Sequence, residues 1–471
     1  MRKKRLLAMA LSFVMIGAAC GSDDDKSSPS EPAATTAAAE TTAATETTPA
    51  AETTEAAATT EAVATTEAVA TTDAPETTVG DTTTTEYVPP ARGDADLVIW
   101  ADDTRAPTLR PLADAFGEAE GLTVSVLEVP FDKIRDNLST AGPAGEGPDI
   151  IIGAHDWLGE LVSNGAVAPI DLGAAADLYA EVAVKAFTYD GAVYGLPYAV
   201  ENIALIRNTE LVPEAPATFE ELEEIALALQ ADGTVDVPLA VQQGPADPYH
   251  NYPLFSAAGG YVFGQAADGS YDSSDLGIDS AGGLRAATLF KQWSDEGLIS
   301  KDVTYDVMIE SFGQGKAPFA ITGPWAVAEA DRGFKATGVP YVVEPIPPFA
   351  DGGVPQVFVG VQGFMVSAFS ENQDLAKTFL LDYVNSQDVQ LQLFEAGGRP
   401  PAMLSAFDQV SDDPDVQGFG LSGQQGIPQP AIPAMSKVWD TWKDSYNLIF
   451  TGSDPEQAFT DAATTIREAI G

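Results

Sequence analysis

Side chains on which most enzyme active sites depend are scarce in this sequence. Its 471 residues include one cysteine, Cys20, and two histidines, His155 and His250, which stand far apart. No HExxH, GxSxG or P-loop motif is present, and no group of residues has the spacing of metal ligands. We therefore expect no metal, no cofactor and no catalytic residue of the metalloenzyme, hydrolase-triad or nucleotide-binding kinds.

Basic residues are also few. Lysine and arginine number 23 against 70 aspartates and glutamates, which gives a formal net charge of -47. Because phosphate backbones are bound by basic surfaces, this balance argues against a nucleic-acid partner. The hydrophobic share of 45% is normal for a globular protein, and the length is sufficient for two or more domains.

Residues 1–19 have the organisation of a secretory signal peptide. The basic run MRKKR precedes a short apolar run, LLAMALSFVMIGAA, which is short for a stable transmembrane helix. Cys20 follows Gly17, Ala18 and Ala19, an order that resembles the bacterial lipobox. The resemblance implies that Cys20 is lipidated and becomes the mature N-terminus. The alternative is an ordinary signal peptide with a spare thiol, because a lone cysteine has no intramolecular disulfide partner.

Residues 20–92 are expected to form a disordered tether. They are built from Ala, Thr, Glu and Pro, with repeats such as TTEAVATTEAVATTDA, and contain no aromatic residue before Tyr87. Such a composition does not bury a core, and its acidic residues repel one another. The tether would hold the folded part away from a membrane or through a cell wall.

From Asp94 onward the sequence alternates between strand and helix patterns, which predicts an α/β fold with mainly parallel sheets. Residues 189–194 read as a hairpin that turns at Asp190-Gly191, and Thr218 is a plausible cap for a helix over 219–229. We expect further strands at 97–100, 122–129, 150–152, 357–361 and 364–366, helices at 108–118, 131–138, 157–162, 374–383, 438–449 and 454–470, and a loop at 418–433.

A change of chemistry at residues 150–156 marks a candidate site. Three buried isoleucines are followed by Gly153, Ala154, His155 and Asp156. Small residues let a ligand approach the backbone, and ligands in open α/β sheets bind beyond the carboxyl ends of the strands. The alternative is that His155 and Asp156 begin a surface loop and cap the following helix.

Large aromatic side chains lie beside polar ones elsewhere in the chain, at Tyr249, Trp325, Trp439 and Trp442. Sugars bind where flat aromatic faces meet carboxylates, amides and arginines. A lone tryptophan is more often a core residue, but Gly323-Pro324 should break the strand and leave the Trp325 ring at a loop.

Six motifs in order resemble one family, the extracellular solute-binding proteins of bacterial ABC importers, and within it the maltose/maltodextrin-binding proteins. They are GPDIIIGAHD, YGLPYAVENIALIRN, DPYHNYPLFSAAGGY, GKAPFAITGPW, FVGVQGFMVSAFSENQDLAKTFLLDYV and IPAMSKVWD. The resemblance covers nearly all of residues 94–471. It implies a two-lobed periplasmic-binding-protein fold of type II-like topology, with a hinge and a ligand in the cleft between the lobes. By alignment, the first lobe comprises 94–200 and 357–405, and the second 204–352 and 410–471.

The resemblance also implies which side chains meet sugar. Asp156 matches a carboxylate that accepts from hydroxyls, Glu201 the acidic residue at the first crossing, and Asp247 the Glu of a Glu-Pro-Tyr motif. Arg105 aligns near a basic residue of the first loop, where the motif WADDTRAPT departs from the best-known member. Further candidate contacts are Asp102, Asp103 and Arg399.

Three aromatic residues, Tyr249, Trp325 and Trp439, match residues that stack on sugar rings. Gly153 departs from the family, because the enteric maltose binder has a sugar-stacking tryptophan there. Trp157 stands where that protein has arginine, so one aromatic platform is lost and another is gained nearby. This departure keeps open a sugar other than maltose.

The implied function is that of a monomeric, lipid-anchored protein on the outer face of the membrane, which captures maltose or a maltodextrin and delivers it to an ABC permease. One alternative is another oligosaccharide or disaccharide, such as trehalose, on the same fold. A second is a glycosidase that uses two of Asp156, Glu201 and Asp247, and a third is a structural surface protein with an inactive cleft.

Overall fold

The computed structural model describes residues 87–267 and 269–471. Cys20, the signal peptide and the tether before Tyr87 lie outside the described residues. Within the part described, no helix is both long and apolar enough to cross a membrane. The end of the expected tether contacts the folded part, because Arg92 donates to Asp149 Oδ2 at 2.6 Å and to the Gly147 carbonyl at 2.9 Å.

The first sheet is centred on β1 and β3, two apolar strands that are buried along their whole length. Its order is β15-β14-β3-β1-β2, and β1 runs parallel to both β2 and β3. The expected strand at 150–152 forms the first three residues of β3, which continues to Ala154. The members are β1 (Leu97–Ala101), β2 (Val124–Glu128), β3 (Ile150–Ala154), β14 (Phe358–Ser367) and β15 (Ile427–Pro428), with β4 (Val167–Ala168) and β7 (Gly195–Glu201) paired to β14.

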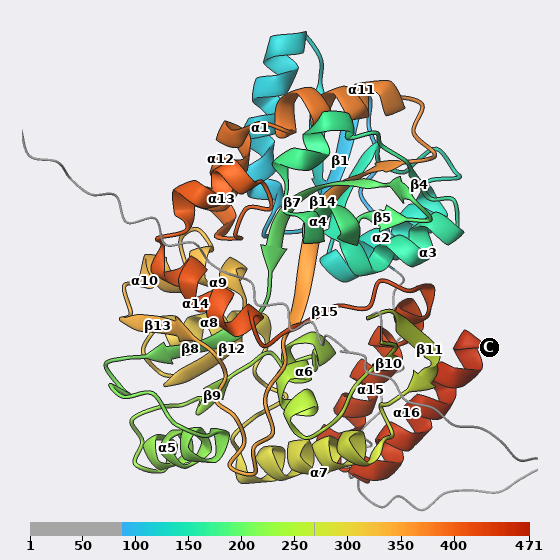
Figure 1. Ribbon diagram of the computed structural model, residues 1–471. Helices are drawn as coiled ribbons and strands as arrows, with labels where there is room; N and C mark the ends of the chain where they lie inside the picture. Colours follow the sequence, from blue (N-terminus) through green and yellow to red (C-terminus); the bar gives the residue numbers. More distant parts are fainter. Residues whose placement is uncertain (1–86, 268) are drawn as a thin grey trace, which may run out of the picture. The chain divides into compact units, whose positions relative to one another are not determined.

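Helices cover this sheet and share one apolar core with it, and we call the sheet and these helices the first lobe (Figure 1). Leu109, Leu112 and Phe116 show the reason, since their spacing places them on the buried face of α1. The helices are α1 (Ala106–Glu120), α2 (Phe131–Ala141), α3 (Leu158–Ser163), α4 (Glu181–Ala186), α11 (Gln373–Thr378) with its π-helical continuation (Phe379–Val384), α12 (Gln387–Gly397) and α13 (Leu404–Val410).

The second sheet has the order β13-β8-β12-β9 and its own apolar core, and we call it with its helices the second lobe. Its strands are β8 (Ala204–Asn208), β9 (Leu239–Ala240), β12 (Phe319–Thr322) and β13 (Tyr341–Glu344). Its helices are α5 (Phe219–Ala231), α6 (Pro248–Ala257), α7 (Ala281–Glu296), α8 (Tyr305–Gly313), α9 (Pro324–Ala328), α10 (Phe334–Thr337), α14 (Pro414–Gly423), α15 (Trp439–Phe450) and α16 (Pro455–Ile470).

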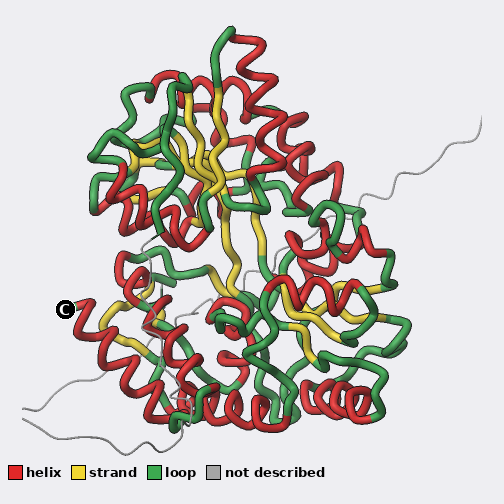
Figure 2. The backbone as a smooth tube through the Cα atoms, turned by 180° about the vertical axis from the view of Figure 1, so that it is seen from behind, coloured by secondary structure: helices red, strands yellow, loops and turns green. Residues whose placement is uncertain are grey.

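Two long strands, β7 and β14, lie side by side where the chain passes between the lobes (Figures 1 and 2). The chain leaves the first lobe along β7 and returns along β14, so the two strands run antiparallel. The returning strand β14 is also antiparallel to β3. In the second lobe, β8 is antiparallel to both of its neighbours, β12 and β13. The expected strands at 357–361 and 364–366 are one strand with an irregularity between Gln362 and Gly363. The lobe boundaries in residue numbers remain a prediction.

Local signals in the sequence place several elements correctly. The hairpin of β5 (Thr188–Tyr189) and β6 (Ala192–Val193) turns at Asp190 and Gly191, which both have positive φ. Thr218 Oγ1 accepts from the Glu221 amide at the start of α5. A second hairpin joins β10 (Phe263–Gln265) and β11 (Tyr271–Leu276), and 3₁₀ turns occupy His155–Trp157, Gly173–Leu178 and Pro433–Lys437.

The expected loop at 418–433 is wrong over its first part, which is the second half of α14. Asp413 accepts from the amides of Asp415 and Val416, and therefore starts a helix that buries Val416 and Phe419. The glycines that suggested a loop serve packing instead, because a Cβ at Gly418 would collide with Val343. Packing against β13 therefore outweighs the low helix propensity of glycine in this segment.

Candidate functional site

The loop after β1 carries a buried ion pair. Asp102 is 2% exposed and accepts from the backbone amides of Thr104 and Arg105 and from the Thr104 hydroxyl, and it forms an ion pair with the Arg105 guanidinium. Burial by itself would raise the pKa of Asp102, but the charges of Arg105 and Arg399 hold that pKa below its ordinary value. Asp103, the next residue, is exposed.

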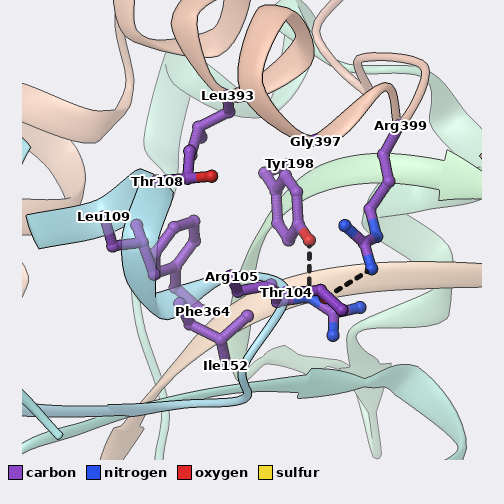
Figure 3. A pocket seen from close by; sticks show the side chains of 10 residues that line it. All are labelled: Thr104, Arg105, Thr108, Leu109, Ile152, Tyr198, Phe364, Leu393, Gly397 and Arg399. Atoms are coloured by element: carbon purple, nitrogen blue, oxygen red, sulfur yellow. Dashed lines mark hydrogen bonds between the residues drawn. The ribbon is translucent and has the colours of Figure 1, made fainter. Parts of the chain in front are cut away.

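Arg105 begins α1 and turns inward. Its Nε donates to the Tyr198 hydroxyl at 2.8 Å, and its guanidinium lies 5.0 Å from the ring centroid of Phe131. Arg105 and Tyr198 line a small, largely apolar cavity (Figure 3), whose volume of about 10 Å³ has room for about one water molecule. The Arg105 side chain therefore makes its contacts inside the first lobe. Its Nη2 also lies 3.8 Å from Glu201 Oε1.

Glu201, at the end of β7, is held by two protein donors. Arg399 Nε donates to Glu201 Oε2 at 2.8 Å, and Gln362 Nε2 donates to Oε1 at 2.8 Å. Glu201 is only 4% exposed, so this pairing offsets the cost of burying its charge. Arg399 is also 4% exposed, and its Nη2 donates to Thr104 Oγ1 at 3.0 Å (Figure 3).

The segment that carries Arg399 touches the second lobe. The Arg399 guanidinium lies 5.5 Å from the ring centroid of Trp325. Gly398, which has φ 66°, packs against α9 so closely that a Cβ at this position would stand 2.5 Å from Ala328 Cβ and 3.0 Å from the Pro324 carbonyl oxygen. Among the described residues, this is one place where site residues of the two lobes meet.

The second meeting place joins Asp156 to Trp439. Trp439 Nε1 donates to Asp156 Oδ2 at 3.1 Å, whereas Asp156 Oδ1 is buried and has no hydrogen-bond partner. Burial raises the pKa of Asp156 to about 6, against the opposing charge of Arg135. Asp156 makes no capping hydrogen bond to α3, so the surface-loop alternative is wrong for this residue.

His155 connects the strands at the crossing. The Val361 amide donates to His155 Nδ1 at 3.1 Å, so the proton is on Nε2, which lies 3.2 Å from the Gln429 carbonyl. Burial lowers the pKa of His155 to about 4, which keeps the ring neutral. These contacts give His155 a structural role at the crossing.

Trp157 occupies the space that a side chain at position 153 would need. A Cβ on Gly153 would collide with the six-membered ring of Trp157. The indole is 5% exposed and packs against Phe131 at 4.7 Å between ring centroids. Gly153 and Trp157 must therefore be considered together. The space beside position 153 is filled by the aromatic ring of Trp157, four residues further along the chain.

A group of aromatic rings from the second lobe lies beside Phe358, the first residue of β14. Tyr249 lies 6.4 Å from Trp325 and 6.3 Å from Phe358, and Phe358 in turn lies 6.2 Å from Trp439. Trp325 was expected on a loop, but it lies in the first turn of α9, because Pro324 favours the first helical position. Its ring covers Gly323, where a Cβ would collide with it. Tyr249 and Trp325 are partly exposed.

Asp247 has a local structural role. It begins α6, where Oδ1 accepts from the Tyr249 amide at 2.9 Å and Oδ2 lies 2.6 Å from His250 Nδ1. Burial would raise the pKa of Asp247, but the His250 interaction and the amide hydrogen bond hold it below the ordinary value. Asp247 therefore orients the segment that carries Tyr249.

Most of the expected site residues lie in one connected network. Contacts join Asp102, Arg105, Glu201 and Arg399 in the first lobe, and continue through Trp325 and Tyr249 to the second. Thr104, Tyr198 and Gln362 were missed. Tyr198 and Gln362 are each a polar group on a strand whose other residues are largely apolar or glycine, and that pattern could have revealed these two.

Comparison with known proteins identifies the family. Residues 111–418 match the family model described as bacterial extracellular solute-binding protein. The chain belongs to this family.

Three similar proteins indicate the range of the relatives. The galactooligosaccharide-binding protein of Bacillus subtilis (strain 168) is 30% identical over 390 residues, which are 80% of this chain and 90% of the relative. The maltotriose-binding protein of Pyrococcus abyssi (strain GE5 / Orsay) is 28% identical over 79% of this chain and 80% of its own. The solved Thermus thermophilus maltotriose binding protein bound with maltotriose is 31% identical, with a TM-score of 0.73, over 80% of this chain and 100% of that one.

These likenesses confirm the expected solute-binding family and its two-lobed α/β fold. The relatives named here are binding proteins, and none is named as an enzyme. The family description also places such proteins outside the cytoplasm.

Proposed function

We propose that this protein captures an oligosaccharide, maltose or a maltodextrin, between its lobes and delivers it to an ABC permease. The proposal is supported by aromatic faces and buried polar groups that come together at the crossing. Trp325, Tyr249 and Trp439 offer flat apolar faces of the kind that stack on sugar rings. The sugar would be held without chemical change and released to the permease as the lobes open.

The observation that carries the proposal is the free oxygen of Asp156. Asp156 Oδ1 is enclosed and has no hydrogen-bond partner of ordinary geometry, although the Gln429 side chain lowers the pKa of this carboxyl, while Oδ2 accepts from Trp439 on the other lobe. An unpaired buried acceptor is costly, and a sugar hydroxyl would supply the missing donor. A ligand at this position would contact both lobes, and its binding would favour their closure.

A glycosidase would need two of the three candidate carboxylates free for acid–base or nucleophilic work. Glu201 is bonded by Arg399 and Gln362, and Asp247 caps α6 and bonds His250. Only Asp156 of the three retains a buried oxygen without a partner. These contacts favour binding without catalysis.

A calorimetric panel of maltose, maltotriose, trehalose, sucrose and cellobiose tests the proposal. We expect binding of maltose or maltotriose, and each sugar should be recovered intact after incubation. Cleaved maltotriose would refute a binding function without chemistry. Absence of binding to any of the five sugars would refute the oligosaccharide proposal as stated.

One second candidate has specific support, a galactooligosaccharide. The Bacillus relative is named a galactooligosaccharide-binding protein, and the match spans 90% of that protein's length. In addition, the Gly153–Trp157 arrangement differs from the enteric maltose binder. Adding galactobiose to the panel separates the two sugars, because tighter binding of galactobiose than of maltose would favour this candidate.

The anchor and partners complete the proposal. The lipobox-like sequence supports lipidation of Cys20, which would hold the protein on the outer face of the membrane by its tether. The protein would work as a monomer that docks on permease subunits. Metabolic labelling with a palmitate analogue should label the wild type and not Cys20→Ala.

A further inference from the structure

Gln362, near the centre of β14, carries a second buried acceptor without a donor. The residue is 5% exposed, and its Oε1 is enclosed with no hydrogen-bond partner. Its Nε2 donates to Glu201 Oε1 at 2.8 Å. Buried amide oxygens are normally satisfied, so an unsatisfied one in this place requires an explanation.

The orientation of the Gln362 amide is fixed by its neighbour. The Glu201 carboxylate only accepts hydrogen bonds, so the amide must present its NH₂ group to it. The oxygen is then necessarily the atom that lacks a partner. Rotating the amide would place oxygen against carboxylate and would leave Glu201 with one fewer donor.

The position of Gln362 places it at the proposed sugar site. In the sheet it lies opposite Ala154 of β3 and Ala199 of β7. Asp156 follows Ala154 by two residues, and it also has a buried oxygen without a partner. The β3 residue that pairs with Gln362 thus precedes Asp156 by two positions, and the Gln362 amide itself is bonded to Glu201, another residue of the proposed site.

We propose that Gln362 reads a sugar hydroxyl, with Oε1 as the acceptor, while its Nε2 holds Glu201 in place. The inference rests on the proposed function and extends it by naming a specificity-determining residue. Both oxygens of Glu201 already accept, from Arg399 and Gln362, whereas Gln362 Oε1 has no donor. Hydroxyl recognition at the crossing would thus depend on the amide as well as on the carboxylate.

Calorimetry with Gln362→Met tests the role, since methionine keeps the length and removes the acceptor. The ligands are the best-binding sugar of the panel and its monodeoxy analogues. We expect the variant to bind the intact sugar on the order of tenfold more weakly. We also expect it to lose discrimination against one analogue only, the one that lacks the hydroxyl read by Gln362.

Gln390→Met is the matched control. Gln390 is also a buried glutamine with an unpartnered Oε1, but it lies in α12 and donates to the Val384 carbonyl. This variant should leave sugar affinity unchanged, which separates recognition from loss of a buried amide in general.

The outcomes are distinguishable. If Gln362→Met weakens every analogue by the same factor, the residue acts only through Glu201 and the inference is overturned, and the same holds if affinity does not change. If the wild type binds none of the sugars, the proposed function itself falls, and this inference falls with it.

Discussion

Gly398 of the first lobe packs against Ala328 of the second so closely that a single Cβ at position 398 would stand 2.5 Å from Ala328 Cβ. The same segment positions Arg399, which is bonded to Glu201 and lies over Trp325. The two lobes can therefore approach this closely only because residue 398 has no Cβ.

Gly398→Ala should oppose closure. We expect sugar affinity to fall about tenfold, and small-angle scattering should show a smaller decrease in radius of gyration on adding sugar. Because Gly398 has φ 66°, alanine there also carries backbone strain of about 1 kcal/mol. Gly397→Ala is the control, since its Cβ would meet only a flexible arginine end at 3.3 Å. Adding Ala328→Gly to Gly398→Ala should restore part of the affinity; no recovery would mean that backbone strain, and not the interlobe contact, is responsible.

Trp325→Ala should remove the main stacking face. The ring is partly exposed beside Tyr249 and beneath Arg399, so its loss should weaken sugar binding by roughly a hundredfold or abolish it. Trp442→Phe, in the core of the second lobe, should lower thermal stability and leave the affinity unchanged. Unchanged affinity in Trp325→Ala, measured by calorimetry, would remove this ring from the site.

Sugar affinity should fall as pH decreases through about 6. The pKa of Asp156 is raised to about 6 by burial, and the charged carboxylate is the stronger hydroxyl acceptor. Below that pH the neutral form dominates, so affinity at pH 5 should be about tenfold weaker than at pH 7. Asp156→Asn should bind more weakly at pH 7 and should show no such dependence. An equally steep pH profile in that variant would assign the titration to another group.

Glu223→Gln should stabilise the protein at alkaline pH. Burial and the neighbouring Glu296 raise the pKa of Glu223 to about 7, above its ordinary value. Because the folded pKa is raised, stability is highest at acid pH and is lost as pH rises from about 4.5 through 7. Allowing for its partial exposure, we expect a gain of roughly 1 kcal/mol at pH 8 and little change at pH 5 by denaturant unfolding. Glu224→Gln removes the same charge from an exposed position and should not reproduce the gain.

Sequence patterns predict the framework well, because it depends on local periodicity and on motifs in order. The buried isoleucines of β3, the Thr218 cap and the Asp190-Gly191 turn are all local signals. The helix at Pro414–Gly423 was missed because glycines in sequence do not reveal the strand against which they pack.

The sequence predicts which residues form the candidate site, but it does not predict which of them contact one another. Motifs identified Glu201 and Arg399 separately, but their hydrogen bond joins residues 198 positions apart. Likewise, Gly153 reads as a lost ring until the fold shows Trp157 lying on it. Side chains that act through such long-range contacts need coordinates before their roles can be assigned.

The hydrogen bonds of His155 at the crossing should survive acidification to a lower pH than the proposed contacts with the ligand. Its ring stays neutral in the folded protein down to about pH 4, so the links to Val361 and Gln429 persist in mild acid. Asp156, the adjacent residue, changes its charge near pH 6. Acidification should therefore unload the protein before the connection between its strands is lost, and neutralisation should make it ready to bind again.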